Sequence, residues 1–194
     1  PIFEIRLEAI RNKLAIERAQ SDAKLKYEFE ARQRLYREIG PLKFQLLIAV
    51  RDFALQVNSW SKGDRDFPIT PDNYYGASVL HKITRLWAIL ELIEQRVSLA
   101  DFSVDDEAQA ILQLKRGVWT AFSSGQAAFD HPEANWDEQE QHLYYNSITR
   151  IANGVLEVQD GSLVTMPFHL FEDFISSRPG KTAIKPLPAL FDQF

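Results

Sequence analysis

Residues 2–39 contain neither glycine nor proline, and Gly40 and Pro41 follow them directly. So long a stretch without a helix breaker, with charged residues spaced four apart, is typical of one long surface helix. Pro41 has no N–H to donate to the carbonyl of Arg37, and its ring clashes with the preceding turn. We therefore expect the first helix to end near Ile39 and a second helix to begin at Pro41.

The N-terminal part of this expected helix carries a narrow apolar stripe. Its residues recur at spacings of four, three and four, which places them on one helix face, and they are Phe3, Leu7, Ile10 and Leu14. A helix over residues 2–39 would be about 57 Å long, whereas a globule of 194 residues has a radius of gyration of roughly 16 Å. Either the helix projects and a second copy or a partner helix covers the stripe, or it folds back and buries the stripe against its own bundle.

The segment 41–60 is apolar on nearly every side, which is typical of a buried helix, so we expect it to be the central helix of a bundle. No segment alternates apolar and polar residues over a sustained length, so no strand is expected. The fold class is therefore all-α: a helical bundle of about five to six helices with a long charged N-terminal helix. Capping residues and apolar periodicity predict the other helices at about 71–97, 103–122, 138–159 and 165–178.

This pattern divides the chain into three parts. Residues 1–39 form a long charged helix that serves as a stalk or oligomerisation arm, residues 40–177 form the helical bundle, and residues 178–194 form a proline-rich C-terminal tail. The tail also contains five large apolar residues. We expect it to dock either on its own bundle or on another chain.

Composition narrows the classes of function. The chain has no cysteine, so disulfides and thiolate metal sites are excluded. Residues 1–39 carry a net charge of +2 and the rest a net charge of −7, which lacks the basic excess of a nucleic-acid-binding protein. No apolar run approaches the ~20 residues of a membrane span. We expect a cytoplasmic protein, or the cytosolic part of a protein with an upstream membrane anchor.

No catalytic or metal-binding motif is present. The chain lacks the Glu-x-x-His pairs of bundle di-iron sites, the HExxH zinc motif and the GxSxG nucleophile turn. The sequence Gly180–Thr182 resembles the end of a phosphate loop, but Ile175 stands where that motif needs glycine. We therefore expect no cofactor, no metal and no catalytic residue, and enzymatic activity is disfavoured.

One group of side chains has the chemistry to bind a small anion. His81 and Arg85 are one turn apart on the predicted helix 71–97, and Tyr74 and Tyr75 lie just upstream. A histidine, an arginine and two phenols together are able to hold an anionic ligand. The alternative is that His81 and Arg85 are surface residues or form ordinary bonds within the bundle.

The sequence favours a non-catalytic helical interaction or scaffold module that self-associates or binds a partner through its N-terminal helix. The segment 101–140 holds nine acidic and two basic residues, so it has the charge to face the basic N-terminal helix of a second copy. The alternative is a small-molecule sensor or enzyme with a pocket near Tyr74, Tyr75, His81 and Arg85.

Overall fold

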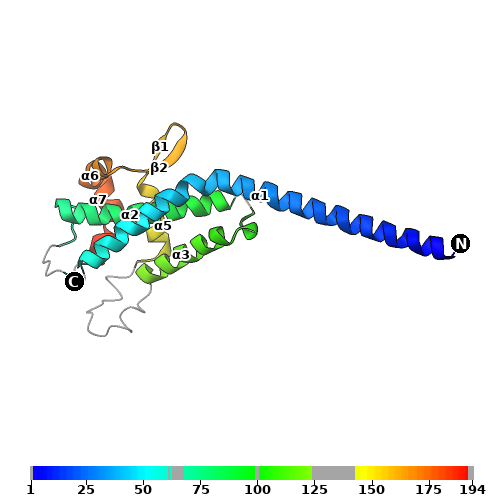
Figure 1. The fold of residues 1–194 in the computed structure, drawn as a ribbon. Helices are drawn as coiled ribbons and strands as arrows, with labels where there is room; N and C mark the ends of the chain where they lie inside the picture. Colours follow the sequence, from blue (N-terminus) through cyan, green and yellow to red (C-terminus); the bar gives the residue numbers. More distant parts are fainter. Residues whose placement is uncertain (1, 61, 63–67, 99–100, 124–142, 192–194) are drawn as a thin grey trace.

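The computed structural model describes residues 2–60, 62, 68–98, 101–123 and 143–191. These residues form a body of packed helices from which one long helix projects (Figure 1), so the all-α expectation is confirmed. The elements in chain order are α1 (Ile2–Trp60), α2 (Tyr74–Val97), the 3-10 helix η1 (Phe102–Val104), α3 (Asp106–Ser123), α5 (Tyr145–Gly154), β1 (Leu156–Gln159), β2 (Ser162–Thr165), α6 (Phe168–Ser176), α7 (Arg178–Ile184) and α8 (Pro186–Ala189).

Helix α1 continues through Pro41, so the predicted helix end near Ile39 is wrong. The reason is that one apolar face recurs in helical phase on both sides of the proline, with Leu35 and Ile39 buried before it and Leu46 buried after it. A proline inside a helix costs about 3 kcal/mol, whereas burying each of these side chains contributes about 1.5–3 kcal/mol. Pro41 is itself exposed, so the carbonyl that loses its partner lies on the solvent side.

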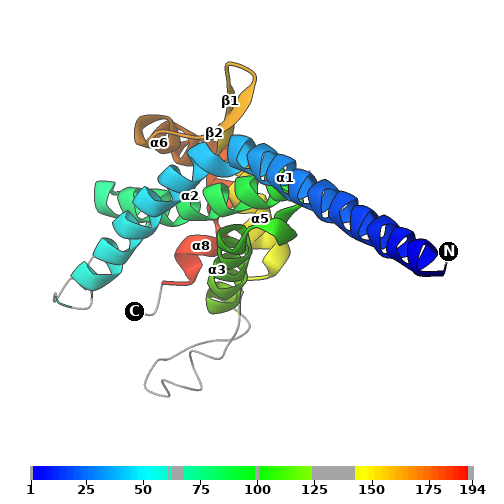
Figure 2. The ribbon, with the colours of Figure 1, turned by 45° about the vertical axis from the view of Figure 1, so that its right-hand side comes forward.

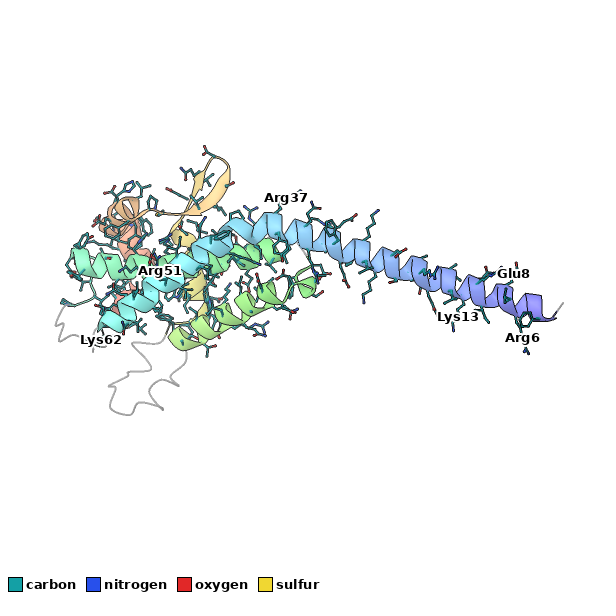
Figure 3. The ribbon with its side chains drawn as sticks, in the orientation of Figure 1. Arg6, Glu8, Lys13, Arg37, Arg51 and Lys62 are labelled. Carbon is teal, nitrogen blue, oxygen red and sulfur yellow. The ribbon has the colours of Figure 1, made fainter. Side chains whose placement is uncertain are left out.

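The proline leaves a bend rather than a break. Figure 3 shows α1 changing direction over the body, with Arg37 labelled near the top of the bend and Arg6 near the free end. Sharp bends in helices occur where the ladder of i to i−4 hydrogen bonds is interrupted, and proline is a frequent cause. Residues on both sides of the bend pack on the body, with Leu35 and Ile39 before Pro41 and Leu46 after it in the core, and the helix leaves the body only further toward its N-terminus.

Helix α2, and not the segment 41–60, is the central helix. It packs against α1, α3, α5, α6 and β2, and its buried residues include Leu80, Trp87 and Ile93. The opposite side of α1 faces solvent, so the prediction of a fully buried segment 41–60 is wrong. We call this exposed surface the outer face; it consists of Phe44, Leu47, Ile48 and Leu55.

A β-hairpin replaces the end of the predicted helix 138–159, which is a correction to the sequence analysis. Helix α5 ends at Gly154, and β1 pairs with β2 in antiparallel register, with Val158 opposite Leu163. Asp160 and Gly161 both have positive φ, 51° and 76°, as a two-residue type I′ turn requires. Residues 138–142 of the predicted helix lie outside the described residues.

Three helix starts also differ from the predicted ones: α6 begins at Phe168 rather than near Thr165, which ends β2, and α2 and α3 have other caps. Asn73, rather than Thr70, caps α2 by accepting a hydrogen bond of 2.6 Å from the backbone N–H of Gly76. Asp105, rather than Ser103, accepts a hydrogen bond of 2.9 Å from the N–H of Ala108 in the first turn of α3. Both are Asx caps of the usual type, so the sequence indicated the right chemistry at a position a few residues away.

The C-terminal tail docks on its own body, which answers the question that the sequence left open. Its residues form α7 and α8, and Ile184, Leu187 and Leu190 are buried. Phe191 lies 6.0 Å from Trp60 between ring centroids, so the tail covers the end of α1. Ser177 caps α7 by accepting a hydrogen bond from the N–H of Gly180.

Replacing Pro41 by alanine tests the continuous helix. Pro41→Ala restores the missing N–H and removes the clash, so we expect the free energy of unfolding to rise by about 2 kcal/mol. Urea denaturation measures it. Pro179→Ala is the control, because Pro179 lies in the first turn of α7 where proline fits, and we expect it to be neutral or to destabilise by up to about 1 kcal/mol. A neutral Pro41→Ala would indicate a helix break at this position.

Candidate functional site

The structure places His81 in the contact between α2 and α6. Its Nε2 lies 2.9 Å from the carbonyl oxygen of Met166, so Nε2–H donates. The centroid of its ring lies 5.4 Å from that of Phe168 and 5.1 Å from that of Phe171. Burial lowers the pKa of His81 below its usual range and outweighs the hydrogen bond to Met166, which raises it. These contacts give His81 a structural role.

The other three predicted pocket residues surround His81 only in part. The ring of Tyr74 packs edge-on against Tyr75 and against Phe168. Arg85 points the other way, to α1, where its Nη1 lies 3.9 Å from a carboxylate oxygen of Asp52. The structure thus brings Tyr74 and His81 to one aromatic cluster and Arg85 to another contact. The small-molecule site stays a prediction.

The pH dependence of stability tests the role of His81. Because its pKa is lower in the folded chain than the ordinary value of about 6.5, the unfolded chain binds more protons below pH 7, and stability falls as pH drops through about 6.5. His81→Gln keeps a donor for Met166 and cannot be protonated. We expect a smaller loss of melting temperature between pH 7 and pH 5 in this variant. The control is His169→Gln, at an exposed position on α6. The structural role of His81 would be contradicted if His81→Gln left the fall in melting temperature unchanged, or if His169→Gln reduced it equally.

The N-terminal part of α1 projects into solvent, so the folded-back alternative is excluded. Near the base of this part, the hydroxyl of Tyr27 donates a hydrogen bond of 2.8 Å to Asp101 in the body. We call the stretch Ile2–Ala23 the arm; its 22 residues span about 33 Å. All four residues of the apolar stripe are exposed, with Phe3 at 77% and Ile10 at 59%. Figures 1 and 2 show the arm clear of the body from both directions.

A cleft lies where the arm joins the body. The guanidinium Nε of Arg32 donates a 2.9 Å hydrogen bond to the carbonyl of Val104, which ties α1 to η1. Lys43 forms an ion pair of 2.8 Å with Glu107. We call this the foot cleft; its volume is 560 Å³, and it is lined by Lys24, Tyr27, Glu28, Arg32, Tyr36, Asp101, Ser103, Val104, Asp105, Asp106 and Glu107.

Ionised carboxylates at the foot cleft fix the angle of the arm. Hydrogen bonds from Ser103 and Tyr27 hold the pKa of Asp101 below its usual range, and the same bond to Asp101 raises the pKa of Tyr27. Burial alone would raise the pKa of Asp105, but the N–H of Ala108 and the ammonium of Lys43 outweigh it, so the net shift is downward. These carboxylates stay charged at neutral pH and hold α1, η1 and α3 together.

Substitutions of Asp105 test this anchor. Asp105→Ala removes the cap of α3 and a partner of Lys43, so we expect a loss of about 1–2 kcal/mol in the free energy of unfolding. Asp105→Asn keeps a capping oxygen, and we expect a smaller loss. Because the pKa of Asp105 is lowered on folding, its contribution is present above about pH 4 and disappears as pH falls through the folded value. Urea denaturation at pH 7 and at acidic pH measures these losses. Equal free energies of unfolding for Asp105→Ala and Asp105→Asn at both pH values would refute the anchor.

The body also contains a buried ion cluster with a structural role. The ammonium of Lys115 on α3 lies 2.7 Å from a carboxylate oxygen of Glu91 on α2 and also contacts Glu94. It lies 4.7 Å from the centroid of the Trp119 ring. Removing one partner of such a pair leaves a buried charge without compensation. The cluster therefore fixes α3 on α2 rather than offering a reactive group.

The other features of the structure give less support for a binding site. A groove of 580 Å³ is lined by Arg150 on α5 and by Arg178, Pro179, Thr182 and Ala183 on or near α7. None of the residues predicted to bind a small molecule lines this groove or the foot cleft. Within the described part of the chain, no three His, Asp or Glu residues are grouped to hold a metal ion. In the same residues, no helix is long and apolar enough to cross a membrane.

Sequence reasoning missed the outer face of α1. Phe44 is 73% exposed and Leu47 is 68% exposed. The sequence did contain a sign of this exposed face, because the segment 41–60 is apolar on nearly every side. Burial on all sides was the wrong inference, since only one side of α1 packs against α2.

Comparisons of the chain with protein-family models, with curated proteins and with solved structures found no match.

Proposed function

We propose that the protein is a non-catalytic helical interaction module whose arm binds a helix of a partner or of a second copy. The observation that carries the proposal is the exposed apolar stripe on a helix that projects about 33 Å beyond its last anchor. A contiguous exposed apolar face of this kind marks an interaction site more often than it occurs by accident. A cytoplasmic setting is part of the proposal.

Helix physics supports this use of the arm. Most of the stability of a helix in a protein comes from packing of an amphipathic face, and residues 3, 6–8 and 10–23 of the arm are all exposed. The spacing Phe3, Leu7, Ile10 and Leu14 is that of the core positions of a coiled coil. A second helix packed on this stripe would bury four large side chains and stabilise the arm itself.

The test compares two isoleucines of equal exposure on the arm. Ile10 lies in the stripe and is 59% exposed, whereas Ile16 lies off the stripe and is 58% exposed. The probe is a synthetic amphipathic peptide of about three heptads with leucine at core positions and glutamine at flanking positions. We expect the full chain to bind it, and Ile10→Asp to weaken binding about tenfold or more while Ile16→Asp has little effect.

Fluorescence anisotropy of the labelled peptide measures the binding, and light scattering over a concentration series measures self-association. Helix propensity falls equally in both variants, so a difference between them reports on the stripe. No binding, together with a monomer at every concentration, would overturn the proposed function. Equal effects of the two substitutions would remove the stripe as the binding surface.

A further inference from the structure

The apolar stripe lies about a quarter turn around α1 from the face that the body buries. A seven-residue period that starts at Phe3 and Leu7 arrives at Ala31 and Leu35, which are both buried against the body. At 100° per residue, four heptads shift the two faces by roughly 80° around the helix axis.

The positions that flank the stripe are basic. Arg6 and Lys13 precede core positions on one edge, and Arg11 and Arg18 follow core positions on the other edge. All four side chains are exposed. Figure 3 shows Arg6 and Lys13 on one side of the arm and Glu8 on the opposite side. Two acids stand near the edges: Glu4 by its sequence position, and Glu17, whose carboxylate lies 4.0 Å from the ammonium of Lys13. Basic residues therefore outnumber acidic ones beside the stripe.

These charges work against pairing of two arms. In a parallel pair, flanking residues five apart meet across the interface, so Arg6 faces Arg11 of the second copy and Lys13 faces Arg18. In an antiparallel pair of overlapping stripes, Arg6 of one copy faces Lys13 of the other, which is repulsive. Position 4, which is acidic in the sequence, faces Arg11 of the other copy, and this attraction at most cancels the repulsion. Like charges at such positions are destabilising, so neither arrangement gains from its charges.

We propose that the occupant of the stripe is a partner helix whose own apolar face is flanked by aspartate and glutamate. The inference rests on the proposed function and names the chemistry of the partner. An acid-flanked helix forms favourable pairs with Arg6, Lys13, Arg11 and Arg18. The partner helix should end before the foot cleft. Asp101, Asp106 and Glu107 line that cleft and would repel the acidic flanking residues of a partner helix that extended further along α1.

Three peptides with one core test the inference on the full chain. They share leucine at core positions and differ only in their flanking residues, which are glutamate, glutamine or lysine. We expect the glutamate peptide to bind about tenfold more tightly than the lysine peptide in about 0.05 M salt. The difference should shrink in about 0.5 M salt, because exposed pairs are screened.

A matched pair of variants locates the effect. Arg11→Glu reverses a flanking charge, and Lys26→Glu makes the same change of charge at an exposed position of α1 beyond the end of the arm. We expect Arg11→Glu to weaken binding of the glutamate peptide about threefold and to improve binding of the lysine peptide, and Lys26→Glu to change neither. Circular dichroism of both variants checks that the helix content is retained.

The possible failures are distinguishable. Equal binding of the glutamate and lysine peptides would overturn the acidic partner and leave the proposed function standing. Binding of none of the three peptides by a chain that is monomeric at every concentration would overturn both. A dimer of the full chain that dissociates on Ile10→Asp would identify a second copy as the occupant and overturn the heterotypic partner.

Discussion

The burial of one face of α1 against α2 determines the rest of the structure. Leu35 and Ile39 before Pro41, and Leu46 and Ala49 after it, contact the same core. The hydrophobic free energy of that contact exceeds the cost of an interrupted hydrogen-bond ladder. Because the helix stays continuous, its N-terminal part has no freedom to fold back on the body. The arm is therefore a direct consequence of packing at the other end of the same helix.

The body holds that helix at several points along its length. On the far side of α1 the outer face is open, while the inner side contacts α2 along much of its length. At the foot cleft, Tyr27 and Arg32 bond to the segment between α2 and α3. Lys43 bonds to Glu107 in the first turn of α3. Several individually modest polar contacts at one place give a rigid base. A rigid base lowers the entropic cost when a partner helix binds the arm.

Some of the architecture was readable from local pattern. The helical class followed from periodicity, and the termini of α2 and α3 were placed to within a few residues by capping chemistry. The hairpin was missed because its strands are four residues each, too short for period-2 alternation to show, although Asp160-Gly161 is a recognised turn signal. The role of His81 was not readable either, since its partners Met166 and Phe168 are far away in sequence.

The sequence by itself determined that the chain is helical, that its N-terminal helix is long and charged, and that an apolar stripe runs along that helix. These properties depend on residues within a few turns of one another. The tertiary structure alone decided that α1 passes through Pro41, that α2 is central, that the tail docks on the body and that the arm projects. Each of these outcomes is a balance between a local preference and burial against a distant segment. Such a balance is settled only when the distant segment is in place, because burial free energy depends on which surfaces meet.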